Sequence, residues 1–152
     1  MKNGVKGTYA LVLRLDSETC VEVGRFGEHT FPPGYYAYIG SARSGLRQRL
    51  ARHLKTGKKL RWHVDYLREH ADAVEVWYVV SEQVSECELS EAVSAMPGAS
   101  QPVKGFGSSD CRCRSHLVYF QRKPEFKAVS RSTAGAGLKR LSLCGQSDLE
   151  TI

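Results

Sequence analysis

Two basic side chains stand four residues apart in a segment with helical spacing. Leu46, Leu50 and Leu54 recur at intervals of four, so a helix beginning at residue 46 would turn these leucines toward a core. Arg49 and His53 then lie one turn apart on the flank of that apolar face. A guanidinium is always charged and donates in a planar fork, and a neighbouring imidazole can orient an oxygen or move a proton. The pair predicts a binding site for a phosphodiester group.

A second candidate group is a glutamate on the apolar side of a predicted helix. Residues 81–96 have helical spacing, and their apolar side chains share one half of a helical wheel. Glu88 falls inside that half, between Ala92 and Ala95, whereas Glu86 falls in the polar sector. A carboxylate among apolar side chains is costly unless it is paired or bound to a cation. Glu88 is therefore predicted to hold a divalent metal ion, with a buried salt bridge to an arginine as the alternative.

Strands and helices must bring these groups together. Alternating apolar and β-branched residues predict strands at 8–15, 20–25, 35–39, 74–80 and 116–120, the second pairing back on the first as a hairpin. Helical spacing predicts helices from residue 46 and over 60–70 and 81–96, and 26–33 reads as a loop. This order favours an α/β (α+β) domain with a small central mixed or antiparallel sheet flanked by helices.

The length of 152 residues fits one domain. Residues 1–123 carry the strand and helix patterns, and residues 124–152 are small, polar and weakly patterned, which predicts a loosely ordered C-terminal tail with one helical turn at 138–143. Five unevenly spaced cysteines do not form a disulfide framework. No apolar run is long enough for a membrane span or a signal peptide. We expect a soluble, cytoplasmic protein without a membrane partner.

Positive charge is concentrated in one segment. The chain carries a net charge of +6, and residues 34–70 hold nine basic residues against two acidic ones. A basic face is typical of proteins that bind a polyanion, and nucleic acid is the common polyanion in a cell. An ordinary solvated surface is the alternative. The predicted nucleic-acid contacts are Arg43, Arg47, Arg52, Lys55, Lys58, Lys59 and Arg61.

Several of these residues also stand in a familiar order. The run Tyr38-Ile39-Gly40, followed by Leu46-x-x-Arg49-x-x-x-His53, resembles the second motif and first helix of the GIY-YIG nuclease superfamily, with Gly7-Thr8-Tyr9 in the place of its first motif. The further runs at 61–67, 86–89 and 105–117 are similar to a small single-domain branch of that superfamily. The resemblance covers residues 7–120.

The resemblance implies roles for individual residues. Tyr9 and Tyr38 would line the site and position or deprotonate the attacking water, and Glu88 would bind one Mg²⁺ or Mn²⁺ ion. Arg49 would neutralise charge on the phosphate, and His53 would orient the phosphate or act as acid or base. The chain has no asparagine after residue 3 to match the superfamily's late asparagine. The role of that asparagine is either vacant or taken by a residue such as Asp110, Ser115 or His116, with His63 as a further supporting residue.

A cluster of cysteines offers a different chemistry. Cys87, Cys111, Cys113 and His116 could supply four ligands to a structural Zn²⁺. A C-x-C spacing is unusual for zinc, however, and cysteines also pack as small apolar residues, so a loop closing over the Glu88 end of the site is preferred. The leading function is a divalent-metal-dependent endonuclease, with DNA ahead of RNA and repair or recombination as the setting. The alternatives are a non-catalytic nucleic-acid-binding module with a degenerate site and, last, a zinc-stapled protein-interaction domain.

Overall fold

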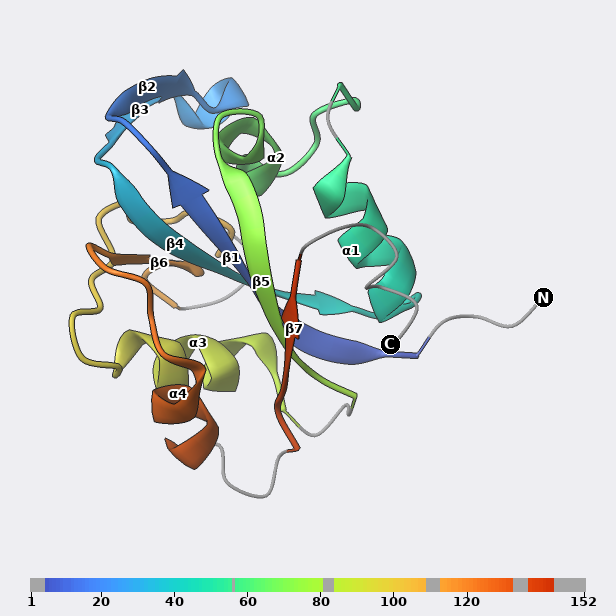
Figure 1. Cartoon of the computed structure of the whole chain (residues 1–152). Coiled ribbons are helices and arrows are strands. Elements are labelled where there is room, and N and C mark those ends of the chain that lie inside the picture. Colours follow the sequence, from blue (N-terminus) through green and yellow to red (C-terminus); the bar gives the residue numbers. More distant parts are fainter. Residues whose placement is uncertain (1–4, 56, 81–83, 109–112, 133–136, 144–152) are drawn as a thin grey trace.

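The computed structural model describes residues 5–55, 57–80, 84–108, 113–132 and 137–143, and its centre is a five-stranded antiparallel sheet (Figure 1). The strands lie in the order β6 (Leu117–Phe120), β4 (Gly34–Ala42), β1 (Gly7–Leu15), β5 (Asp72–Val79) and β7 (Lys139–Ser142). Helices accompany this sheet, so the predicted α+β class is confirmed.

β1 is the central strand, and its composition explains why. The segment GTYALVLRL is apolar at almost every position, which is typical of a strand buried on both faces. Successive side chains alternate, so Tyr9 faces one core and Ala10 faces the other. β4 and β5 pair with β1 on either side. Thr8 of β1 lies opposite Ser41 of β4, which places the start of one strand beside the end of the other.

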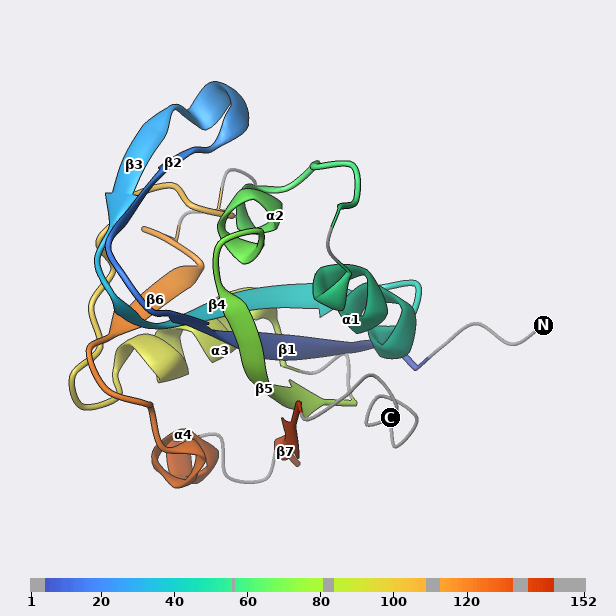
Figure 2. The same ribbon diagram turned by 45° about the horizontal axis from the view of Figure 1, so that its top comes forward.

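Helices cover both faces of the sheet (Figure 2). The helices α1 (Leu46–Leu54) and α2 (His63–Arg68) pack into the core on the Tyr9 face. The helices α3 (Glu86–Ser94) and α4 (Phe126–Ser132) pack on the Ala10 face. Over the part of the chain that is described, none of the helices has the length and apolar character that crossing a bilayer requires.

A small arm differs from the sequence-based expectation. The strands β2 (Thr19–Glu22) and β3 (Glu28–Phe31) form a separate two-stranded sheet, joined by a 3₁₀ turn at Gly24–Phe26. The prediction that residues 20–25 pair back on β1 is wrong, and so is the loop expected at 26–33. Val21 and Phe31 are buried in the same core as α2, so apolar burial rather than pairing with β1 holds the arm in place.

The C-terminal segment also differs. Residues 139–142 form β7 on the edge of β5, so the predicted helical turn at 138–143 is wrong. Glu75 of β5 is 1% exposed, and its carboxylate accepts a hydrogen bond from Trp77 Nε1 (2.6 Å) and pairs with Lys123 Nζ (3.3 Å) and Arg140 Nε (3.9 Å). A buried carboxylate needs such partners, and Arg140 of β7 is one of them. Residues 133–136 and 144–152 lie outside the described part, where the loosely ordered tail stays a prediction.

Candidate active site

An open pocket lies where the start of β1 meets the end of β4, between α1 and the first turn of α3. Its volume is about 750 Å³. Thr8 and Ser41 come from the strands, and Arg49 comes from α1. Glu86 comes from α3, and His116 precedes β6. A guanidinium, a carboxylate and an imidazole therefore face one space, although they are far apart in the sequence.

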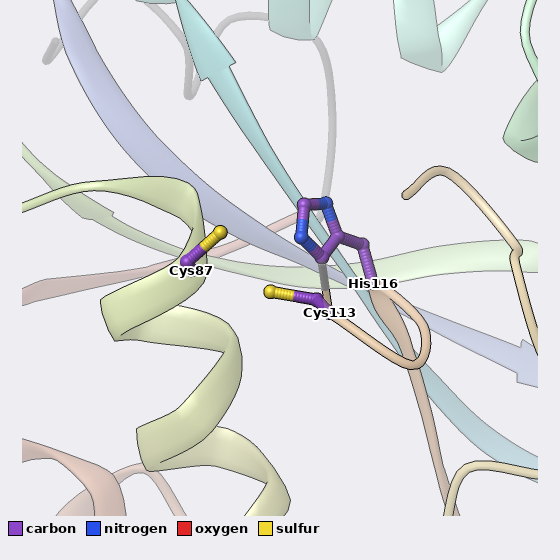
Figure 3. Close-up of side chains that lie close together, drawn as sticks. All are labelled: Cys87, Cys113 and His116. Atoms are coloured by element: carbon purple, nitrogen blue, oxygen red, sulfur yellow. The ribbon is translucent and has the colours of Figure 1, made fainter. Parts of the chain in front are cut away.

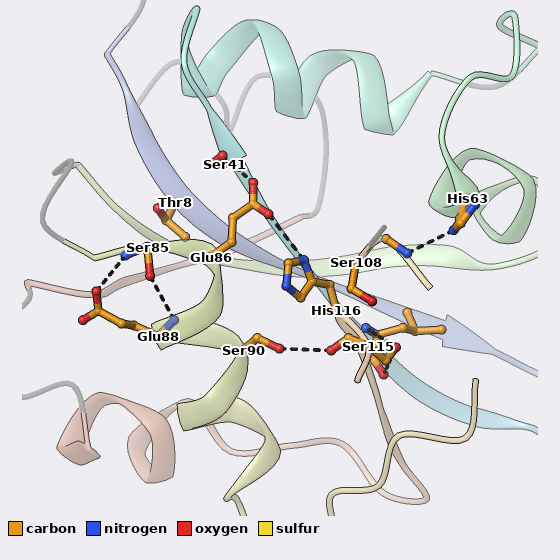
Figure 4. A network of polar contacts seen from close by, with 12 residues as sticks. Thr8, Ser41, His63, Ser85, Glu86, Glu88, Ser90, Ser108, Ser115 and His116 are labelled. Carbon is orange, nitrogen blue, oxygen red and sulfur yellow. Dashed lines mark hydrogen bonds and ion pairs between the residues drawn. The ribbon is translucent and has the colours of Figure 1, made fainter. Parts of the chain in front are cut away.

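Glu86 is the carboxylate of this pocket (Figure 4). Its Oε1 accepts a hydrogen bond from the Ser41 hydroxyl at 2.5 Å, and its Oε2 lies 3.3 Å from Nδ1 of His116. The hydrogen bond with His116, joined by that from Ser41, lowers the pKa of Glu86 against the opposing effect of burial. Glu86 is therefore a carboxylate at neutral pH, and it is held by Ser41 of β4 on one side and by His116, which precedes β6, on the other.

Glu88, the predicted metal ligand, lies elsewhere. It is exposed, and its Oε1 lies 3.4 Å from the backbone nitrogen of Ser85, whose hydroxyl accepts from the Glu88 nitrogen at 3.1 Å. This is a capping box at the start of α3, and Figure 4 shows Glu88 directed away from Glu86. The prediction that Glu88 lies on the core-facing side of the helix is wrong. The sequence carries the signal, because Ser85-x-x-Glu88 is the capping pattern and fixes the helix start at Glu86.

Arg49 supplies the positive charge. It lies on α1 one turn before His53, as predicted, and its Nη1 donates to the Ser41 backbone oxygen at 2.9 Å. Its guanidinium carbon lies 4.6 Å from the centre of the Trp62 ring, which is a cation–π distance. Ser41 thus contacts Arg49 through its backbone and Glu86 through its hydroxyl, so both charges are fixed on the same strand end.

Tyr9 and His53 form a buried pair behind the pocket. Both are 0% exposed, and the Tyr9 hydroxyl lies 2.6 Å from His53 Nε2. Burial, reinforced by Tyr38 and opposed by Arg49, raises the pKa of Tyr9 well above its usual value. Burial lowers the pKa of His53 to about 3 against the opposing effect of Asp65. Both side chains are therefore neutral near pH 7, and one hydrogen bond joins the phenol to the imidazole.

The neighbouring strand leaves room for this pair. Gly40 of β4 lies opposite Tyr9 in the register. A Cβ atom on Gly40 would lie 2.6 Å from the Tyr9 hydroxyl oxygen, closer than any side chain tolerates. The glycine of the Tyr38-Ile39-Gly40 motif is thus required by the tyrosine of the other motif.

Tyr38 completes an aromatic group with the same two residues. Its ring centre lies 6.5 Å from that of Tyr9 and 5.9 Å from that of His53. It is half-buried. Burial and the charge of Glu86 raise the pKa of Tyr38, and Arg49 opposes the shift. The two predicted tyrosines, the predicted arginine and the predicted histidine therefore meet at one place.

The predicted nucleic-acid contacts divide into two groups. Arg52 is structural, because it forms a two-point pair with the fully buried Asp65 (2.8 and 2.9 Å) and stacks on Trp62 at 4.1 Å. Lys58 is half-buried and donates to the Lys55 backbone oxygen at 2.6 Å. The remaining predicted contacts are exposed: Arg43, Arg47, Lys55, Lys59 and Arg61. Arg43 also lines the pocket.

The predicted supporting residues His63, Asp110 and His116 do not all lie at the pocket. His116 is 1% exposed and lines the pocket. His63 lies outside the lining, stacks on Phe26 and accepts a hydrogen bond from the Gly107 nitrogen at 3.0 Å. Burial, with a smaller effect of His29, lowers the pKa of His63, so its ring holds the loop as a neutral acceptor. Asp110 lies outside the described residues.

A group of sulfur and nitrogen ligands adjoins the pocket. One side-chain atom each of Cys87, Cys113 and His116 lies within 4.8 Å of the other two, an arrangement that could hold a metal ion. The fourth predicted ligand, Cys111, lies outside the described residues. Cys87 and His116 also line the pocket, so this cluster lies next to the carboxylate of Glu86 on the same side of the pocket.

One comparison gives a relationship to other proteins. Residues 8–137 match the family model described as domain of unknown function DUF123. No curated protein and no solved structure matches the chain. The matched stretch runs from β1 past α4 and includes the pocket, the buried tyrosine–histidine pair and the cysteine cluster. Because the model covers well over half of the sequence, the chain belongs to the DUF123 family.

Proposed function

We propose that the pocket is the active site of a divalent-metal-dependent endonuclease, with DNA as the favoured substrate. The observation that carries the proposal is that Arg49 and Glu86 line one pocket and are both held by Ser41. Hydrolysis of a phosphodiester needs positive charge where the phosphate oxygens gain negative charge, and it gains from a metal held by a carboxylate. The resemblance to GIY-YIG nuclease motifs also nominates Arg49, but it nominates Glu88 as the metal ligand, whereas the glutamate that lines the pocket is Glu86.

Glu86 is the residue that would hold the metal. Mg²⁺ and Mn²⁺ take oxygen ligands, and Mg²⁺ keeps several waters, so one or two carboxylates suffice to bind it beside a phosphate. Glu86 fits this requirement, because it is half-buried, ionised and directed into the pocket. A bound ion would supply positive charge to a phosphate oxygen and a polarised water. Ser41 and His116 fix the carboxylate so that its orientation is set before substrate arrives.

Arg49 binds the phosphate from the opposite wall. Its guanidinium is anchored by one backbone oxygen and by Trp62, which leaves further N–H groups of the fork for phosphate oxygens. The fully buried Tyr9–His53 pair supports the side of α1 that carries Arg49, so its role is positioning. Neither phenol is among the residues that line the pocket. Tyr38 is half-buried whereas Tyr9 is fully buried, so Tyr38 is the phenol that we assign to the attacking water.

The test is cleavage of labelled duplex, branched and single-stranded DNA, and of RNA, with Mg²⁺ or Mn²⁺. Glu86→Gln and Arg49→Lys should each lower the cleavage rate by about 10²–10³-fold, the usual effect of removing one group that stabilises transition-state charge. The matched controls are Glu88→Gln, which preserves the capping box, and Arg14→Lys, which alters an exposed arginine in a salt bridge with Asp72. Loss of cleavage in the controls but not in the pocket variants would refute the assignment.

A non-catalytic nucleic-acid-binding module is the second candidate. It is favoured by the fact that both oxygens of Glu86 already have protein partners, Ser41 and His116. Binding to the exposed basic residues should weaken steeply with salt in either case, because neutralised phosphates release counterions. Salt-sensitive binding by wild type and Glu86→Gln alike, with no cleavage of any substrate, would favour this second function.

A further inference from the structure

Two thiols and an imidazole meet beside the pocket, and nothing in the proposed hydrolysis uses the thiols. Cys87 is the second residue of α3, whereas Cys113 and His116 belong to the segment before β6. Figure 3 shows the two sulfur atoms and the imidazole directed toward a common point. From these contacts we infer that Cys87, Cys113 and His116 bind a thiophilic divalent cation of the Zn²⁺ class, and that the bound ion, through His116, holds Glu86 in the pocket.

The backbone fixes this arrangement before any ion binds. The His116 nitrogen donates to the Phe106 oxygen at 2.8 Å, and its oxygen accepts from the Ile39 nitrogen at 2.9 Å. The adjacent Ser115 oxygen accepts from the Ser90 hydroxyl of α3 at 3.2 Å. The segment that carries His116 is therefore tied both to β4 and to the helix that carries Cys87. Two rigid elements hold the ligands, as a specific metal site requires.

The distances suit a tetrahedral ion after a small movement. The three ligand atoms lie within 4.8 Å of one another. Zn–S bonds of about 2.3 Å in a tetrahedron place two sulfur atoms roughly 3.8 Å apart. Rotation of half-buried cysteine side chains covers a difference of about 1 Å, because staggered rotamers of a short side chain move its end atom by more than this. The described residues supply three ligands, and water or a further group completes the tetrahedron.

The donor atoms select the class of metal. Thiolate and imidazole prefer Zn²⁺ and similar ions, whereas Mg²⁺ takes oxygen ligands. On binding, each thiol releases its proton to solvent, so the ion gains two thiolate ligands and one neutral imidazole. This site is therefore distinct from the Mg²⁺ or Mn²⁺ ion proposed at Glu86, and the two sites would bind different metals side by side.

His116 connects the two sites. Its Nδ1 faces Oε2 of Glu86 at 3.3 Å, and its other nitrogen is directed toward the cysteines in Figure 3. Metal-bound histidines commonly donate their second N–H to a carboxylate, which fixes the ring. A metal on Nε2 leaves the proton on Nδ1, where it can be donated to Glu86. Glu86 is thus a positioning residue for the thiolate site as well as a member of the pocket.

The experiment is a metal titration of the reduced 152-residue chain. Metal binding is followed by absorption spectroscopy, and no nuclease assay is needed. Co²⁺ should bind at one equivalent and produce thiolate-to-metal charge-transfer absorption, and Zn²⁺ should displace it. Cys87→Ser and Cys113→Ser should each diminish this absorption and weaken Zn²⁺ binding, whereas Cys20→Ser, which replaces an exposed cysteine, should leave both as in the wild type. Circular dichroism of each variant establishes that it is folded.

The link to Glu86 has its own readout. Glu86→Gln should weaken Zn²⁺ affinity by about 10–100-fold, as loss of a carboxylate partner does at other metal-bound histidines, while the stoichiometry stays at one. Glu88→Gln on the same helix should leave the affinity unchanged. Folded, reduced wild type that shows no thiolate-to-cobalt absorption would overturn the metal site. Equal affinity in Glu86→Gln and wild type would overturn its coupling to the pocket. Neither result depends on whether the protein cleaves nucleic acid.

Discussion

Burial of the His53 imidazole should make the stability of the protein depend on pH in a specific window. The pKa of His53 is about 3 in the folded chain, against about 6.5 for an unperturbed histidine. Between these values the unfolded chain holds a proton that the folded chain excludes. The free energy of unfolding therefore rises with pH across this window, and the stabilisation is lost as the pH falls below about 6.5.

The magnitude follows from the same two values. Each unit of pH inside the window changes the free energy of unfolding by about 1.4 kcal/mol for one proton. Lowering the pH from 7.5 to 5 should therefore cost the wild type about 2 kcal/mol through His53 alone. His53→Gln cannot titrate, and its amide can still form a hydrogen bond with the Tyr9 hydroxyl. The difference in stability between wild type and His53→Gln should shrink by about 2 kcal/mol over this range, because the carboxylates that titrate are common to both proteins.

Urea unfolding followed by far-ultraviolet circular dichroism at several pH values measures this difference. Fluorescence is less suitable, because Trp62 lies 5.9 Å from His53 and would respond to the substitution itself. The control His70→Gln removes an exposed imidazole and reports any general effect of losing a histidine. A wild type minus His53→Gln difference that stays constant from pH 7.5 to 5 would refute the reasoning, since it would mean that folding does not exclude the proton.

Three further substitutions test the packing around the site. Gly40→Ala should destabilise the protein by about 1–3 kcal/mol, because the new Cβ atom would lie 2.6 Å from the Tyr9 hydroxyl oxygen. In a double-mutant cycle, Tyr9→Phe should relieve part of this loss of stability. Strictly additive losses of stability would contradict the contact. Asp65→Ala should cost about 3 kcal/mol in urea unfolding, because it leaves Arg52 partly buried without its carboxylate, and a cost below about 1 kcal/mol would argue against the pair. Ser85→Ala should lower stability by about 1 kcal/mol through loss of the helix cap, and an unchanged melting temperature would contradict the capping box.

Local patterns predicted the elements that carry the phosphate-binding pair. The spacing of Leu46, Leu50 and Leu54 fixed both the helix and the flank on which Arg49 and His53 lie, and that helix is α1. The apolar runs around Tyr9 and before Val79 predicted the central strands β1 and β5. These predictions succeeded because periodicity reports which side chains one element buries, and that depends on neighbours within the same segment.

The prediction of Glu88 failed for a local reason that the sequence could have revealed. A helical wheel drawn through residues 81–96 counts Val84 and Ala95 toward the apolar half, but Val84 precedes α3 and Ala95 is exposed. Ser85 and Glu88 instead close a capping box, so α3 begins at Glu86. In the arm, the segment of β2 was predicted as a strand, whereas its partner β3 lies in the segment expected to be a loop. β7 is a different case, because it pairs with β5, which is distant in the sequence.

The sequence by itself was enough to predict the central strands and the helix that carries Arg49 and His53. Only the tertiary structure decided which glutamate enters the pocket and which cysteines meet His116. Glu86 depends on Ser41 and His116, which are 45 and 30 residues away in the chain, and Cys87 meets Cys113 only because α3 packs against the segment before β6. Such contacts depend on how separate elements pack, and no period within a single segment records that packing.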